Sequence, residues 1–270
     1  MAGNRIEGNA VRAFVLVTML AFATCGHSEA GAEYRTVSGG SFISALSLDG
    51  ARVPVRIAAF AMRATPVTVG DYLAFVHTHP EWRRDRVPDM YAARGYLASW
   101  AGPLALGSAI DPQRPVTEVS WFAARAFCAS EDARLPAWYQ WEYAAAADAT
   151  RIDARDDPAW SAGILHTLLA RTGHAPGKAG EDTANLYGLH DMNTLVWEWV
   201  DDYAAMFVNA DARDPDQTNL LTLCGGSALA FENRTAYPLM MRVAALSAMR
   251  PTDASGNIGF RCVRETGEAP

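Results

Sequence analysis

Short apolar segments, separated by polar and glycine-containing stretches, set the pattern of this 270-residue chain. After the Gly-Gly-Ser-Phe stretch at 39–42, apolar and polar residues alternate over short distances, which predicts β-strands. Farther along, apolar residues recur at the spacing of helices. The pattern therefore predicts a fold that mixes short strands with helices.

Two of the expected helices follow a residue that suits the N-terminus of a helix. Thr68 precedes the first, which is predicted over 69–76 and ends near His79-Pro80. Ser120 precedes the second, which is predicted over 121–130. The residues expected on the apolar face of the second helix are Phe122, Ala126 and Phe127.

A third helix is predicted to begin at Pro136, and regular patterning fades after it. Residues 148–188 and 201–222 are rich in Asp, Gly, Asn and Thr, which predicts loops. Irregular segments of this length are uncommon in compact domains unless they are functional or are held by a metal or a disulfide. The apolar residues at helical spacing in the third helix are Trp138, Trp141 and Ala145, with Tyr143 beside them.

Acids and tryptophans crowd the segment 185–202, NLYGLHDMNTLVWEWVDD. Asp191 and Glu198 are hard oxygen donors on either side of a short run whose carbonyls could point inward, an arrangement that holds Ca²⁺. In the alternative interpretation, Asp191 caps a turn and Glu198 pairs with an arginine. Trp197 and Trp199 stand at period two, which predicts one buried face of an extended segment.

Composition indicates a globular protein that does not bind nucleic acid. Hydrophobic residues make up 50% of the chain, enough for a real core. The net charge of -7 and the absence of a basic run argue against nucleic-acid binding, so proteins or small molecules are the expected partners. Because no repeat or Pro/Gly-rich linker divides it, residues 32–268 are expected to form a single domain.

The first 30 residues have the pattern of a secretory signal peptide, with cleavage near 23 or 30. The apolar run at 13–23 is about twelve residues long, short of the roughly 20 that span a bilayer. An uncleaved N-terminal anchor and a lipid anchor on Cys25 stay open as alternatives. No other stretch is apolar enough to cross a membrane. The mature chain is therefore expected to lack a membrane span and to be periplasmic or secreted, where cysteines can pair.

Eight motifs follow one another in a fixed order and carry a family resemblance. They resemble the formylglycine-generating enzyme family, also called the sulfatase-modifying factor domain, over essentially all of the mature chain. The resemblance implies an α+β fold related to C-type lectins, poor in regular secondary structure and stabilised by calcium. The motifs are Gly39-Gly40-Ser41-Phe42, Pro66-Val67-Thr68, PVTEVSW at 115–121, Arg134-Leu135-Pro136 followed by Trp141-Glu142-Tyr143-Ala144, Gly188-Leu189-His190-Asp191-Met192, Trp197-Glu198-Trp199, Gly225-Gly226-Ser227 and Gly259-Phe260-Arg261-Cys262.

A structural calcium site is implied by this resemblance. Its ligands fall on the side chains of Asp191 and Glu198 and on the carbonyls of Thr194 and Val196, and hard oxygen donors of this kind suit Ca²⁺. The chain has Asn-Thr-Leu at 193–195 where the family usually has a Gly-Asn pair, so the loop is expected to differ in shape.

A disulfide is also implied, because Cys128 and Cys262 coincide with two family cysteines that pair. A loop of this length is worth roughly 4 kcal/mol in the chain-entropy model. The alternative is two buried free thiols.

The chain departs from the family between Ser227 and Arg242. The formylglycine-generating enzymes carry in this interval a pair of cysteines that binds Cu(I) and activates oxygen. Here the interval contains no cysteine, and neither Tyr237 nor Pro238 can replace a soft thiolate. This departure puts both copper and the usual oxidase mechanism in doubt.

Cys224 stands just before Gly225, where the family usually carries arginine, and is the candidate catalytic residue. It could be a redox or metal-binding thiol, together with the thioethers of Met240 or Met241. The alternative is a small buried hydrophobe on a strand, with the methionines filling the core.

Among family members, the chain looks most like the exported accessory proteins associated with copper nitrite reductase. The leading hypothesis is a periplasmic accessory or maturation factor for a copper or denitrification enzyme, which presents a groove beside the former oxidase site to a partner protein. The second is an oxygen-dependent oxidoreductase of the formylglycine-generating type that acts on a protein cysteine or a small molecule through a different metal site. The third is a lectin-like binding module.

Overall fold

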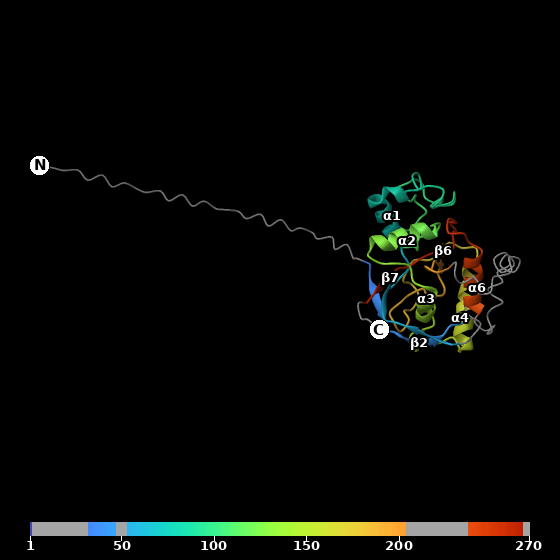
Figure 1. Cartoon of the computed structure of the whole chain (residues 1–270). Helices are drawn as coiled ribbons and strands as arrows, with labels where there is room; N and C mark the ends of the chain where they lie inside the picture. Colours follow the sequence, from blue (N-terminus) through green and yellow to red (C-terminus); the bar gives the residue numbers. More distant parts are fainter. Residues whose placement is uncertain (2–31, 47–52, 204–236, 267–270) are drawn as a thin grey trace. The chain divides into compact units, whose positions relative to one another are not determined.

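The computed structural model describes residue 1 and residues 32–46, 53–203 and 237–266. The compact unit of the chain runs from Ala32 to Pro270. It mixes α and β structure, as the sequence predicts (Figure 1). Long stretches such as 83–120 and 172–196 contain turns, bends and isolated bridges but no regular helix or strand. The relation to C-type lectins stays a prediction.

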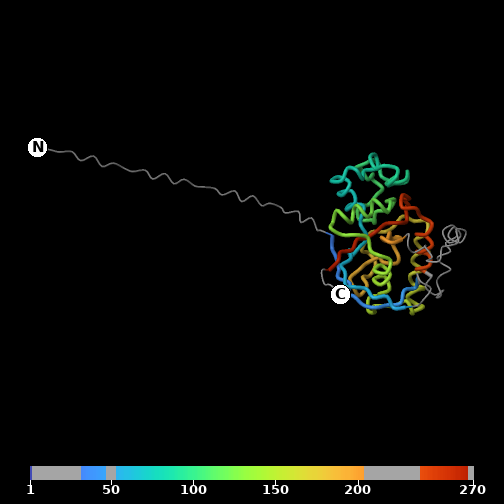
Figure 2. The backbone as a smooth tube through the Cα atoms, in the orientation of Figure 1, coloured from blue at the N-terminus to red at the C-terminus, as the bar shows by residue number. Residues whose placement is uncertain are grey.

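The described strands are short and form three separate sheets. The first and last strands, β1 and β7, lie on either side of β4, so the two ends of the described domain meet in one antiparallel sheet (Figure 2). β2 and β3 form an antiparallel pair, and β5 and β6 a parallel one. The strands are β1 (Tyr34–Val37), β2 (Gly40–Ile43), β3 (Pro54–Ile57), β4 (Phe60–Arg63), β5 (Trp197–Glu198), β6 (Ile258–Gly259) and β7 (Val263–Glu265).

All three predicted helices are confirmed, although the third begins at Trp138 rather than at Pro136. The Thr68 hydroxyl accepts a hydrogen bond from the Asp71 backbone N–H while the Asp71 carboxylate accepts one from the Thr68 N–H, which fixes the start of the first helix. Ser120 caps the second helix in the same way through the backbone N–H of Ala123. The helices are α1 (Val69–Thr78), α2 (Trp121–Ser130), α3 (Trp138–Ala145), α4 (Pro158–Arg171), α6 (Tyr237–Ser247) and the 3₁₀ turn η1 (Pro80–Trp82).

The apolar face predicted for α2 is confirmed at Phe127, which is buried, but not at the other two positions. Phe122 and Ala126 are only half-buried, and Phe122 packs edge-on against the exposed ring of Tyr91. Most residues of α2 are apolar, so the sequence pattern fits several neighbouring faces of the helix and does not show which of these faces is buried. The residues of α2 that are buried are Ala123, Ala124, Phe127 and Cys128.

The loop predicted over 148–188 is also wrong, because α4 occupies its middle. Asp157 caps α4 through the N–H groups of Ala159 and Trp160, and Pro158 stands at its first position. Ile164 is the only buried residue of α4. The helix therefore lacks the strong apolar periodicity from which a helix is predicted in a sequence. α4 packs beside α6 in the fold (Figure 1).

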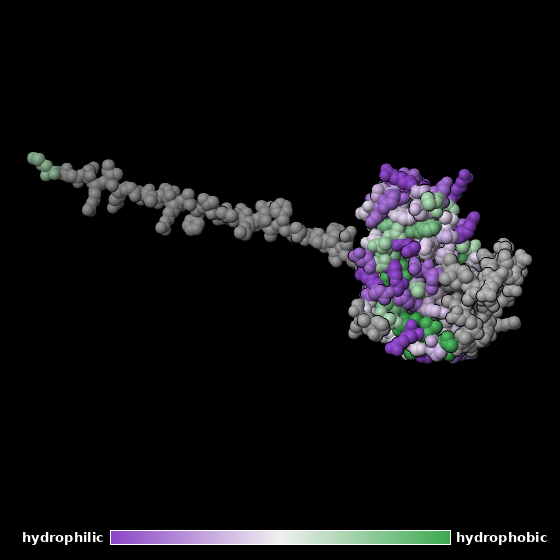
Figure 3. Space-filling model, viewed as in Figure 1, coloured by the Kyte–Doolittle hydropathy of each residue, from purple (hydrophilic) through white to green (hydrophobic). Residues whose placement is uncertain are grey.

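One hydrophobic core joins the helices to the sheets. The rings of Tyr72 and Phe75 from α1, Phe127 from α2 and Phe260 meet at centroid distances of 5.3 to 6.2 Å. On the face seen in Figure 3, hydrophilic residues cover the region over α1, and hydrophobic residues lie in small groups between polar ones. Within the ranges that the structure describes, no helix has the length and apolarity that crossing a membrane requires.

The structure contains the expected disulfide between Cys128 on α2 and Cys262 next to β7. Both cysteines are completely buried, and 134 positions separate them in the sequence. Closing this loop in the unfolded chain is worth about 5 kcal/mol in the chain-entropy model, slightly more than the roughly 4 kcal/mol expected above. The bridge therefore holds the C-terminal strand against α2.

Replacing Gly163 with alanine is expected to stabilise the protein by up to about 1 kcal/mol, because glycine is a poor helix former. A Cβ atom at Gly163 meets no other atom within 4 Å, so the added methyl group causes no clash. Urea denaturation measures the change, and the neighbouring exposed Ala162→Gly serves as the reverse substitution. A loss of stability in Gly163→Ala would show that α4 is not a helix in solution.

Candidate functional site

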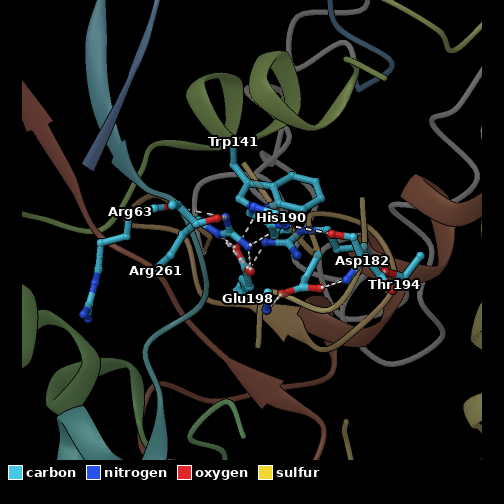
Figure 4. Close-up of polar contacts among 11 residues, drawn as sticks. Arg63, Trp141, Asp182, His190, Thr194, Glu198 and Arg261 are labelled. Atoms are coloured by element: carbon cyan, nitrogen blue, oxygen red, sulfur yellow. Dashed lines mark hydrogen bonds and ion pairs between the residues drawn. The ribbon is translucent and has the colours of Figure 1, made fainter. Parts of the chain in front are cut away.

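A buried ion pair lies at the centre of the segment that the sequence singles out. Glu198 on β5 and Arg261 have side chains that are 0% exposed. The Arg261 Nη2 lies 2.8 Å from the Glu198 Oε1, and its Nε lies 2.9 Å from the Oε2. The indole Nε1 of Trp141 on α3 donates to the same Oε2 at 2.8 Å, so both groups converge on Glu198 (Figure 4). Both carboxylate oxygens therefore have charged or polar donors.

Arg261 also connects two segments, the end of β4 and the loop at His190, through backbone carbonyls. Its Nη2 donates to the His190 oxygen at 2.9 Å, and its Nη1 lies 3.3 Å from the Arg63 oxygen and 3.4 Å from the Ala64 oxygen. A buried guanidinium with this many acceptors compensates for the loss of its hydration. Arg261 thus fixes the ends of β4, β5 and the loop before Asp191 relative to one another.

A second buried arginine, Arg242 on α6, has a different environment. Its Nη2 donates to the Glu198 backbone oxygen, and its guanidinium lies 3.4 Å from the centre of the Trp141 ring. Within the described ranges no carboxylate pairs with it, and its Nε and Nη1 have no hydrogen-bond acceptor. Burial lowers the pKa of Arg242 to about 9, so its charged form carries a cost in the folded state.

Asp191 sits in a tight turn. Its φ angle of 60° is left-handed, and its side chain is almost completely buried. The carboxylate accepts hydrogen bonds from the backbone N–H groups of Gly180 at 2.6 Å and Asp182 at 3.3 Å. Burial raises the pKa of Asp191, while these two N–H groups lower it.

The other two residues of the predicted calcium set, Thr194 and Val196, follow on the same segment. The carbonyl oxygen of Thr194 accepts a hydrogen bond from Arg171 Nη1 at 2.8 Å, and its hydroxyl donates to the Asp182 carboxylate. Val196 is buried. An arginine thus occupies a position next to two of the four expected oxygen ligands, Glu198 and Thr194.

As the side chains stand, this set does not fit a calcium ion. A cation bound by Glu198 would lie against the guanidinium of Arg261, which repels it. The alternative interpretation, Asp191 in a turn and Glu198 paired with an arginine, describes the observed contacts. Calcium at these four residues stays a prediction that would require the arginines to move.

A cavity of about 540 Å³ lies between α4 and the loop before β5. We call it the acid-lined cavity, because its wall includes Asp148, Asp182 and Asp191 and no lysine, arginine or histidine. Its volume is in the range of small-molecule sites. Among the described residues, no group of three His, Cys, Asp or Glu side chains is close enough to hold a metal ion. α4 contributes Trp160, Gly163 and Thr167 to the wall of this cavity.

The two methionines that the sequence associates with the candidate thiol lie in different places, and the thiol itself is not described. Cys224 falls outside the described residues. Met240 is half-buried and packs against the core, while Met241 lines a second cleft between α4 and β5. Pro238 lies near Glu142 and Trp160, around a cavity of about 20 Å³ that has room for one water molecule.

The sequence identifies part of this arrangement and misses the rest. Trp199 is completely buried and donates to the Val119 oxygen at 3.0 Å, as expected, but Trp197 is only half-buried. Arg261 and Arg242 were missed as partners of Glu198. The motif Gly-Phe-Arg-Cys draws attention to Arg261, but no local pattern indicates which acid it meets.

A family model described as "Sulfatase-modifying factor enzyme 1-like domain" matches residues 22–266. A "Formylglycine-generating enzyme" of Streptomyces coelicolor is 34% identical over 189 residues, which cover 62% of this chain and 59% of that protein. An "Inactive C-alpha-formylglycine-generating enzyme 2" of Bos taurus is 31% identical over 185 residues, which cover 64% of this chain and 58% of that protein. A "Hercynine oxygenase" of Mycobacterium tuberculosis is 29% identical and covers 54% of this chain and 38% of that protein. The chain thus spans less than two thirds of the length of these relatives.

Two solved structures are similar over most of the chain. "Structure of PvdO from Pseudomonas aeruginosa" covers 86% of this chain and 94% of that chain, with a TM-score of 0.48 and 17% sequence identity. "Crystal Structure of CarF" covers 87% of this chain and 98% of that chain, with a TM-score of 0.44 and 18% identity.

The two buried arginines are expected to respond differently to substitution by methionine. Arg261→Met leaves the buried Glu198 carboxylate without its cation and is expected to cost about 3–5 kcal/mol. Arg242→Met loses one hydrogen bond and the contact with Trp141 but also removes a costly buried charge, so a change of at most about 1 kcal/mol is expected. Urea denaturation of the two variants makes the comparison. Equal losses would contradict these roles.

Removing divalent cations is expected to leave the melting temperature unchanged, because Arg261 and Arg171 already satisfy Glu198 and the Thr194 carbonyl. Calorimetry with and without EDTA measures this, with elemental analysis of the same sample. Bound calcium together with a clear fall in melting temperature on chelation would show that an ion displaces the arginines.

Proposed function

The chain belongs to the family of the sulfatase-modifying factor enzyme 1-like domain, and on that basis we propose that it is an exported accessory or maturation factor for a redox enzyme. The proposed compartment is the periplasm, and the proposed partner is a copper or denitrification enzyme. The chain would act by binding this partner rather than by copper-dependent oxidation of a cysteine.

The main support for this proposal is the small number of free cysteines in the domain. The chain has four, and the disulfide uses Cys128 and Cys262. Cys25 lies in the expected leader, which leaves Cys224 as the one thiol of the domain. Cu(I) prefers soft thiolate ligands, and a site made from a pair of them needs two free cysteines. The sequence of the domain therefore cannot supply a two-thiolate copper site within one molecule.

The space around Pro238 supports the same proposal. This residue stands in the interval where the copper cysteines of the family are found. Together with Glu142, Trp160 and Leu239 it lines a small cavity of about 20 Å³. A cavity of this size admits a water molecule but no cysteine side chain of a substrate.

The names of the relatives do not decide whether this chain is an active or an inactive member of the family. One is called a formylglycine-generating enzyme and another an inactive one, at 34% and 31% identity. Because the chain spans only 59% and 58% of these two proteins, the activity in either name is not transferred to it. The cysteine content favours the binding role.

An oxygen-dependent oxidase with a different metal site is the second candidate. The similarity to a protein named hercynine oxygenase favours it, since that name denotes oxygen chemistry in a relative at 29% identity. For this chain the substrate would be a protein cysteine or a small molecule. The two candidates differ in whether the purified protein consumes oxygen.

We expect no oxygen uptake when the full chain, purified from a bacterial periplasm, is loaded with Cu(I) and given a cysteine-containing peptide. An oxygen electrode and a copper assay measure the two quantities, and the Streptomyces coelicolor relative serves as the positive control. Cys224→Ser is expected to bind as much copper as the wild type. Robust turnover that disappears in Cys224→Ser would overturn the proposal in favour of an oxidase.

The accessory role itself is tested in the source organism. Deleting the gene is expected to lower the activity of an exported copper or denitrification enzyme, and Cys224→Ser is expected to restore it as well as the wild type does. Unchanged activity of these exported enzymes in the deletion strain would reject the accessory role.

A further inference from the structure

A second cleft, of about 310 Å³, lies between the C-terminal end of α4, the segment 194–197 and α6. We call it the α4–β5 cleft. It is separate from the acid-lined cavity, although Thr194 borders both. Its walls come from parts of the chain that are far apart in sequence, so it is a product of the tertiary fold. The larger side chains in its wall include Leu168, Leu169, Arg171, His174, Trp197 and Met241.

The walls of the α4–β5 cleft are mostly apolar and partly open to solvent. Leu169 at its rim is 63% exposed, which is unusual for a large aliphatic side chain. Leu168 and Trp197 are half-buried. Met241 has a flexible thioether side chain that adapts to different apolar contacts. Together these residues offer a surface for one large apolar side chain of a ligand.

The charge of the α4–β5 cleft differs from that of the rest of the chain. The whole chain has a net charge of -7, and the acid-lined cavity has three aspartates. The α4–β5 cleft has no aspartate or glutamate in its wall, while Arg171 and His174 stand in it. Its charge is thus complementary to a carboxylate.

Arg171 is held in place for such a contact. Its Nη1 donates to the Thr194 oxygen at 2.8 Å, and its Nη2 lies 3.3 Å from the Asp182 carboxylate. Both members of that ion pair are about one third exposed, at 29% and 32%, so the pair is weak and screened by water. A guanidinium has five N–H donors, and these contacts leave others for a ligand. Fixing the side chain in advance lowers the entropy cost of binding.

We propose that the α4–β5 cleft binds an extended segment of a protein partner in which a large apolar side chain stands next to a carboxylate. The apolar side chain lies against Leu168, Leu169 and Trp197, and the carboxylate meets Arg171. This inference rests on the proposed accessory function and names the chemistry of its partner. An apolar anchor beside a charge-assisted hydrogen bond is a common way to combine affinity with specificity.

Three labelled nonapeptides test the proposed chemistry by fluorescence anisotropy. The first, GSGDLFDGS, carries an apolar pair between aspartates; the second has lysine in place of each aspartate; the third has serine in place of the apolar pair. The first is expected to bind about tenfold more tightly than either of the others, and its affinity is expected to fall with salt. Equal binding of the lysine peptide would overturn the proposal.

Substitutions at exposed positions locate the binding. Leu169→Asp places a carboxylate at the rim and is expected to weaken binding of the first peptide about tenfold, whereas Leu169→Lys, with the same loss of apolar surface, is expected to weaken it less. Leu186→Asp is the matched control, because Leu186 is 48% exposed and outside the cleft. Gly256→Glu is a second blocking variant, since a Cβ there meets no atom within 4 Å. Equal effects of Leu169→Asp and Leu186→Asp would overturn the proposal.

Two further outcomes separate this inference from the proposed function. If the protein is a dimer in solution that Leu169→Asp dissociates, the cleft holds a second copy of the chain and the inference is wrong. If the first peptide fails to bind while oxygen uptake and copper loading are absent, the inference falls and the accessory function stands. If oxygen uptake is robust, the accessory function falls whatever the peptide does.

Discussion

The buried contact between Glu198 and Arg261 is the interaction on which the rest of the structure depends. Neither side chain reaches water, so each must find its partner inside the protein. The guanidinium then links β5 to the carbonyls of Arg63, Ala64 and His190. Since the disulfide at Cys262 ties the next residue to α2, one short segment joins the sheet, the helices and the loop over the acid-lined cavity.

This contact also gives Glu198, one of the acids in 185–202, a partner other than a metal ion. A buried carboxylate can be neutralised by a metal ion or by a cationic side chain of the protein. At Glu198 the cationic side chain of Arg261 does this. The cost of burying charge is thus balanced at Glu198 but not at Arg242, whose partners are a carbonyl and a tryptophan ring. The loop before β5 is held rigidly as a result, and two different cavities can form on either side of it.

α4 gives these two cavities their opposite character. It contributes Trp160, Gly163 and Thr167 to a wall that contains three aspartates, and Leu169 and Arg171 to one that contains none. Because Ile164 is the one residue of α4 that is buried, most of this helix faces the two cavities or solvent rather than the core. Under the proposed accessory function, these surfaces rather than the region of Pro238 are where a partner is bound.

The sequence by itself determined the elements with local signals: the caps at Thr68 and Ser120 with the two helices that follow them, the third helix after Pro136, and the family with its disulfide. It also determined that no cysteine pair exists between Ser227 and Arg242. It failed where the signal is not local. α4 has a cap but little apolar periodicity, and the face of α2 depended on what packs against it. Only the tertiary structure decided that Glu198 meets Arg261, because residues 63 positions apart are paired by burial and charge, which no spacing along the chain encodes.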